Sequence, residues 1–72
     1  MMIKKHFHSI SDIQKLQQIA CEVEEPVFLH SLDGSVKVDA KSFIGLFALD
    51  FSQDVYVVTE SDWVERQVNQ IV

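Results

Sequence analysis

The side chains best suited to chemistry in this chain are one serine before an apolar segment, three histidines and a single cysteine. Ser42 precedes the run 43–49, in which every residue is apolar or glycine. A serine there can cap a helix, because its hydroxyl oxygen accepts a hydrogen bond from a backbone N–H one turn later. Ser42 is therefore a candidate helix cap.

The histidines and the cysteine form no recognisable catalytic or metal-binding motif. His6 and His8 alternate and would share a face on a strand, but a metal site would need a third ligand. His30 is expected on the outer face of a strand, with no evident role. Cys21 has no second cysteine to pair with, and a Cys/His nucleophile pair has no motif support. We therefore expect no enzyme activity, no cofactor and no metal.

The composition indicates a single globular domain over residues 1–72. The hydrophobic fraction of 47% is typical of a folded domain, and the net charge is −5. Without a basic cluster, neither a nucleic-acid surface nor a polybasic membrane anchor is expected. An acidic protein of this size is better suited to protein partners. The start lacks a signal-peptide pattern and no apolar run is long enough to span a bilayer, so we expect a cytoplasmic protein.

Hydrophobic spacing predicts four strands and three helices. The strands are expected at 2–8, as an edge strand, and at 27–32, 35–39 and 55–59. The helices are expected from Ser9 or Ser11 to Val23, from Ser42 to about Leu49, and over 62–71. Asp33-Gly34 predicts a hairpin between the second and third strands. This order predicts an α+β fold, an open antiparallel sheet with helices on one face.

Helix-start signals and the apolar stripes refine these expectations. Ser11, with Asp12 in the first turn, is the favoured cap of the first helix, and Ser61 or Thr59 is expected to cap the last. Within the short apolar helix, Leu46 and Leu49 are expected to pack in the core.

The segment Ala40-Lys41-Ser42, followed by two large apolar residues and then Gly45, resembles the region around the regulatory serine of HPr. HPr is the phosphocarrier of the bacterial sugar phosphotransferase system. The predicted element order, βαββαβα, is also that of HPr-like proteins. The likeness in spacing is good from Val27 to the end of the chain and holds only in outline before it.

This resemblance implies roles for the short helix and its cap. Ser42 would be a site of regulatory phosphorylation, and Phe43, Ile44 and Phe47 would form an exposed apolar patch that binds partners. The partner would be a phosphotransferase-system enzyme, a kinase or a regulator. The alternative for these three apolar residues is burial in the core.

Two departures from the family pattern shape the functional prediction. HPr carries its phosphate on a His within Gly-Leu-His-x-Arg-Pro, whereas that position here falls on Ser9 or Ile10, and no Arg or Pro follows. Asp50 stands where the family usually has Gly after the short helix. A phosphohistidine needs cationic or N–H donors to share its charge. We therefore predict an HPr-like regulatory or protein-interaction domain without a phosphohistidine relay.

Two alternatives remain open at the level of the sequence. One is an active phosphocarrier that uses His8 as a shifted phosphoacceptor. The other is a structural or oligomerisation domain of similar fold, in which Phe43, Ile44 and Phe47 are buried in a homo-oligomer or in the core and Ser42 only caps its helix.

Overall fold

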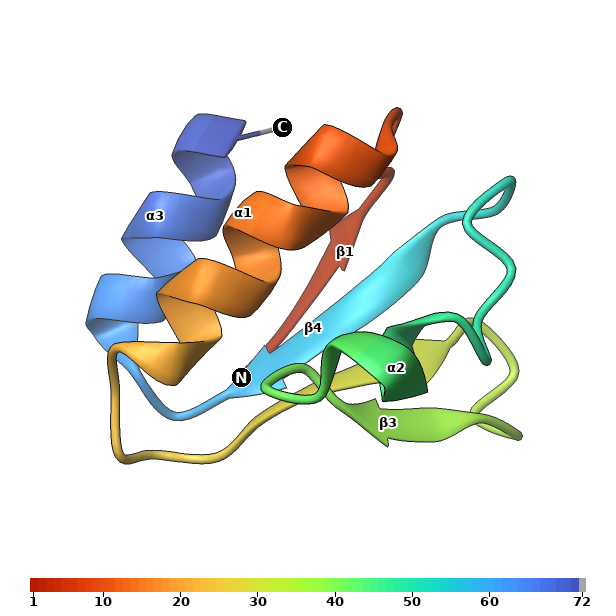
Figure 1. Cartoon of the computed structure of the whole chain (residues 1–72). Helices are drawn as coiled ribbons and strands as arrows, with labels where there is room; N and C mark the ends of the chain where they lie inside the picture. Colours follow the sequence, from red (N-terminus) through yellow and green to blue (C-terminus); the bar gives the residue numbers. More distant parts are fainter. Residues whose placement is uncertain (72) are drawn as a thin grey trace.

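Strands and helices follow one another in the order that the sequence predicts. The computed structural model describes residues 1–71 (Figure 1). Its strands are β1 (Met2–Lys5), β2 (Val27–Ser31), β3 (Lys37–Asp39) and β4 (Val55–Thr59). Its helices are α1 (Ile10–Cys21), α2 (Phe43–Leu46) and α3 (Asp62–Ile71). The predicted α+β class is confirmed.

The four strands form one antiparallel sheet in the order β1-β4-β2-β3. The last strand in the sequence therefore lies inside the sheet, where Val57 is opposite Ile3 of β1 on one side and Leu29 of β2 on the other. The N-terminal strand lies at an edge, as predicted, but it ends at Lys5 rather than His8. Both edge strands are short, which limits unwanted pairing with other chains.

The three helices lie on one face of the sheet (Figure 1). The buried apolar side chains of the helices and strands form one hydrophobic cluster. Burial alternates along the inner strands as expected for a sheet covered on one side. In β2, for example, Val27 and Leu29 are fully buried while Phe28 is 39% exposed. The buried apolar side chains are Phe7, Ile13, Leu16, Ala20, Val27, Leu29, Ala40, Leu46, Leu49, Val55, Val57, Val64 and Val68.

The N-cap of helix α1 lies two residues earlier than the sequence analysis favours. The hydroxyl of Ser9 accepts a hydrogen bond from the backbone N–H of Asp12 at 3.2 Å, so Ser9 is the N-cap and Ser11 lies inside the helix. The helix also ends at Cys21 rather than Val23, because the N–H of Glu22 already bonds the carbonyl of Ile19 in a tighter turn.

The hairpin at Asp33-Gly34 forms, but its loop is longer than predicted and spans residues 32–36. Gly34 adopts φ +75°, a conformation that favours glycine. The carboxylate of Asp33 accepts hydrogen bonds from the hydroxyl of Ser31 and from both the N–H and the hydroxyl of Ser35. These bonds organise the loop locally and keep Leu32 and Val36 out of the strands.

Helix α3 agrees with its predicted range and is capped by Ser61. The Ser61 hydroxyl accepts from the N–H of Val64 at 3.2 Å, and the Ser61 N–H in turn donates to the hydroxyl of Thr59. Val64 and Val68 are fully buried, one turn apart. Val64 and Val68, at positions i and i+4, therefore form the apolar stripe that packs this helix against the rest of the core.

Within residues 1–71 no helix is both long enough and apolar enough to cross a membrane.

Candidate functional site

Ser42 is the N-cap of α2, as the sequence predicts. Its side chain is exposed to solvent and its hydroxyl accepts a hydrogen bond from the N–H of Gly45 at 3.3 Å. The backbone at Ser42 is extended (φ −99°, ψ 106°), the geometry expected of a residue that precedes a helix. The hydroxyl therefore combines a structural bond with access from solvent.

The helix behind this cap is shorter than predicted, ending at Leu46 rather than Leu49. The N–H groups of Phe47, Ala48 and Leu49 each bond a carbonyl three residues earlier, which tightens the chain into turns after one helical turn. This tight path directs some apolar side chains inward and leaves others outside.

The three residues predicted to bind partners lie at the surface to different degrees; we call Phe43, Ile44 and Phe47 the α2 patch. Ile44 is 85% exposed and Phe47 is 59% exposed. Phe43 is half-buried against the core, and its ring meets that of Phe47 edge to face with centroids 5.1 Å apart. The patch therefore has one anchored aromatic residue and two side chains that are mostly exposed.

Buried residues on either side of the patch hold α2 in place. Leu46 and Leu49 are 1% and 8% exposed, so their predicted core role is confirmed, and Ala40 before the helix is fully buried. A Cβ placed on Gly45 would lie 3.4 Å from the Ser42 hydroxyl and 3.9 Å from the Val38 Cβ. These are ordinary van der Waals distances, so an alanine side chain would fit at this position between the cap and β3.

Lys41 ties this segment to the end of α1. Its ammonium group donates to the carbonyl oxygens of Val23 at 2.8 Å and Glu24 at 3.4 Å. The Lys41 carbonyl in turn accepts from the side-chain amide of Gln17 at 3.2 Å, and the thiol of Cys21 lies 3.8 Å from it. Lys41 therefore acts as a structural cation that binds the carbonyls just after a helix, a role that the sequence analysis did not assign.

The carboxylates near α2 are held by local turns. Asp39 accepts from the N–H of Lys41 at 2.8 Å. Asp50, which stands where HPr-like proteins usually have glycine, accepts from the hydroxyl of Ser52 at 2.6 Å and from its N–H at 3.0 Å. The hydroxyl bond, followed by the N–H bond, lowers the pKa of Asp50. A negative charge thus lies at each end of the short helical segment.

A second cluster of polar side chains lies between β1 and α1. The Nδ1 atom of His6 is 2.9 Å from a carboxylate oxygen of Asp54, in the turn before β4. The rings of His6 and His8 are 4.7 Å apart, and His8 is exposed and immediately precedes the cap Ser9. Both histidines lie beyond the end of β1, so they do not share a strand face as the sequence analysis considers.

The Asp54 contact was not predicted, because 48 residues separate its partners. Nothing in the local sequence around Asp54 signals a histidine neighbour. Within the described part of the chain, no group of three or more His, Cys, Asp or Glu side chains is arranged to hold a metal ion.

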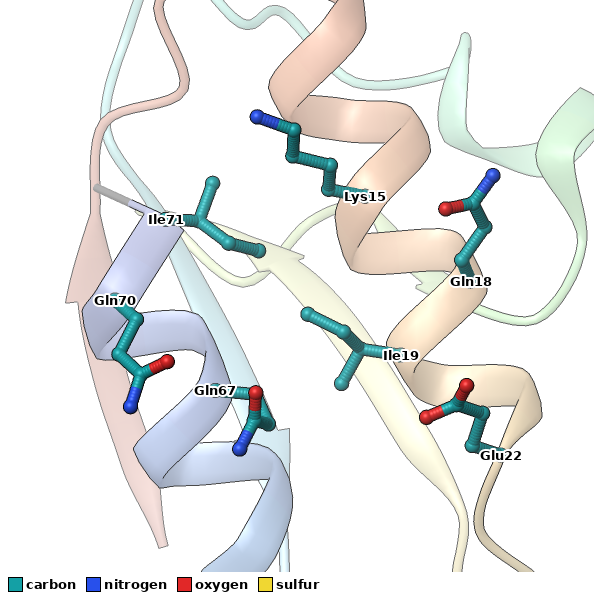
Figure 2. A pocket seen from close by; sticks show the side chains of 7 residues that line it. All are labelled: Lys15, Gln18, Ile19, Glu22, Gln67, Gln70 and Ile71. Carbon is teal, nitrogen blue, oxygen red and sulfur yellow. The ribbon is translucent and has the colours of Figure 1, made fainter.

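A groove of about 310 Å³ lies between α1 and α3 (Figure 2). Ile19 of α1 and Ile71 of α3 point toward each other across it. The remaining lining side chains are polar or charged: Lys15, Gln18, Glu22, Gln67 and Gln70. No residue singled out from the sequence lies in this groove, and it is separate from α2 and from the histidines.

These features define a small α+β domain with a four-stranded antiparallel sheet, three helices on one face and an exposed apolar patch on the shortest helix. Comparisons of the chain with protein-family models, with curated proteins and with solved structures gave no match.

Proposed function

We propose that this chain is an HPr-like regulatory or protein-interaction domain, related to the sugar phosphotransferase system, that binds a protein partner through the α2 patch without a phosphohistidine relay. The observation that carries the proposal is the exposure of Ile44 and Phe47 on the short helix that follows a solvent-accessible capping serine. Large apolar side chains grouped at the surface of a small domain are typical of interaction sites. The element order βαββαβα supports the HPr-like part of the proposal.

Ser42 is the regulatory residue of this proposal. It precedes the exposed patch residues Ile44 and Phe47 by two and five positions, and its hydroxyl accepts a hydrogen bond from the N–H of Gly45. Phosphorylation would add close to two negative charges beside the patch. It would weaken the binding of an acidic partner and strengthen the binding of a partner that has an arginine or lysine opposite Ser42.

One experiment tests phosphorylation and partner binding together. The protein is incubated with an HPr serine kinase and ATP, and the modified residue is located by mass spectrometry, with Ser42→Ala as the control. Binding to phosphotransferase-system enzymes and regulators is then measured for the wild type, Ile44→Asp and Phe47→Asp. Binding that survives both aspartate substitutions would rule out the α2 patch as the contact surface.

A phosphocarrier that uses His8 is the second candidate, and the position of His8 favours it. This exposed imidazole directly precedes the N-cap of α1, where the helix dipole favours an anion. Asp12 in the first turn opposes a phosphate there, and this is why the relay-free function ranks first. Incubation with the general phosphotransfer enzyme and phosphoenolpyruvate separates the two candidates: acid-labile label that disappears in His8→Gln would establish the carrier.

An oligomerisation domain would use the same patch differently. In that case Phe47→Asp would convert a dimer into a folded monomer, as measured by sedimentation. A wild-type protein that is already monomeric and loses partner binding on the same substitution would support the regulatory domain.

A further inference from the structure

The sheet face opposite the helices carries a second set of apolar and basic side chains. We call it the outer sheet face, and the residues that matter for its binding properties are Met2, Lys4, Phe28, Lys37, Tyr56 and Val58. None of the three helices covers this face (Figure 1). Met2 is 58% exposed and Phe28 is 39% exposed, so the surface is only partly polar.

Strand register arranges these side chains in two rows across the sheet. In the first row Val58 is flanked by Met2 and Phe28, which gives a continuous apolar strip over three strands. In the second row Lys4 pairs with Tyr56, which pairs with His30, which pairs with Lys37. The second row therefore has aromatic rings at its centre and one lysine at each edge.

The two lysines are available to a partner. Both are exposed, and within residues 1–71 neither ammonium group forms an ion pair or hydrogen bond. Among the paired strand residues of this face the one carboxylate is Asp39, which accepts a bond from the N–H of Lys41. The exposed Glu60 follows directly after β4, and its carboxylate is 3.8 Å from the N-terminal ammonium group. In a chain of net charge −5, the paired residues of this face thus include two unpaired lysines and one carboxylate that is bonded locally.

We propose that the outer sheet face binds an amphipathic α-helix of another protein whose apolar stripe is flanked on both sides by Asp or Glu. Strands at the two sheet edges lie about 14 Å apart across four strands, and a helix is roughly 10–12 Å wide. A helix lying along the central strands would place its apolar stripe on Phe28, Tyr56 and Val58. Acidic residues on its two flanks would then reach Lys4 and Lys37.

The physical basis is the same as for the domain's own architecture. Helices pack against apolar sheet faces, and here the chain supplies such a layer on one face only, while the other face carries an apolar strip. Charge complementarity at the two edges selects acidic flanks over basic ones. An extended peptide is disfavoured on this face because strands add to sheet edges.

The test uses two synthetic helical peptides of about five turns each. The first has leucines at i, i+3, i+4 and i+7 and glutamates on both flanks, and the second has lysines in place of the glutamates. Each peptide is titrated into the ¹⁵N-labelled protein. We expect the glutamate peptide to shift the amide signals of the outer sheet face, and its affinity to fall as salt is added. The lysine peptide should bind less tightly.

Charge reversal makes the result decisive. The double variant Lys4→Glu, Lys37→Glu should bind the glutamate peptide about tenfold more weakly, which is roughly what two exposed ion pairs contribute. The same variant should bind the lysine peptide more tightly than the glutamate peptide. The matched control Lys15→Glu reverses an exposed charge on α1, which lies on the other face of the sheet, and should leave both affinities nearly unchanged. None of these substitutions changes the α2 patch, so this test does not depend on the proposed function. The proposal is overturned if the glutamate peptide does not bind, if its shifts map to α2, or if the double variant binds it as tightly as the wild type.

Discussion

The ammonium group of Lys41 donates to the carbonyl oxygen of Val23 at 2.8 Å and so joins the segment before α2 to the segment that leaves α1. In the sequence, Lys41 is the middle residue of an Ala-Lys-Ser motif next to a candidate regulatory serine. In the fold, its ammonium group is bonded to the backbone carbonyls that follow α1. The residue that precedes Ser42 therefore positions α2 and is not offered to a partner.

Removing this contact should destabilise the domain without unfolding it. Lys41→Met keeps most of the aliphatic stem but leaves the Val23 carbonyl without its donor, and we expect a loss of about 1 kcal/mol in the free energy of unfolding. Urea titration followed by circular dichroism measures this loss. Lys15→Met, at an exposed position on α1, serves as the control, and an equal loss in both variants would contradict the assigned role of Lys41.

Ser42 should contribute to stability through its cap. Ser42→Ala removes the acceptor for the N–H of Gly45 and should cost about 1 kcal/mol, whereas Ser42→Asp retains an acceptor and should cost less. Thermal or urea unfolding of the two variants provides the comparison. If Ser42→Ala were as stable as the wild type, the hydroxyl would have no capping role and only the regulatory hypothesis would remain.

Neighbouring residues of α2 should respond in opposite ways to substitution. Ile44→Asp, at an 85% exposed position, should change the free energy of unfolding by no more than about 0.5 kcal/mol. Leu46→Ala, two residues later and 1% exposed, should lose about 2–5 kcal/mol because it leaves a cavity in the core. A large destabilisation by Ile44→Asp would mean that this side chain is buried in solution.

The hairpin loop should make stability depend on acid pH. Hydrogen bonds from the N–H and hydroxyl of Ser35, and then from the hydroxyl of Ser31, lower the pKa of Asp33 from 3.8 to about 2. The folded state therefore binds fewer protons than the unfolded state between these pH values, and stability rises with pH. The contribution of Asp33 to stability is complete above the pKa that its carboxyl has in the unfolded state. It is lost as the pH falls through the lower pKa of the folded state.

Asp33→Asn should flatten this dependence, since the amide does not titrate. Unfolding free energies of the wild type and Asp33→Asn, measured by urea titration at several pH values between 2 and 5, give the comparison. Parallel pH profiles for the two proteins would show that the Asp33 bonds do not persist in solution.

Local signals in the sequence determined the order of elements and much of the core. The period of the apolar residues identified α3 and its buried stripe, and a serine before an apolar run identified the cap of α2. These features depend on residues a few positions apart, so they can be derived without the fold. The same reasoning favoured Ser11 as the cap of α1, whereas the cap is Ser9. The backbone conformation decides which of two nearby serines caps the helix, and the sequence does not reveal that conformation.

Tertiary structure alone decided which side chains meet and which remain exposed. The contact between His6 and Asp54, the attachment of Lys41 to the end of α1 and the two rows on the outer sheet face join residues far apart in the sequence. The exposure of Ile44 beside the buried Leu46 follows from how the short helix docks against the core. Such contacts depend on the packing of whole elements against one another, and no periodicity along the chain encodes them.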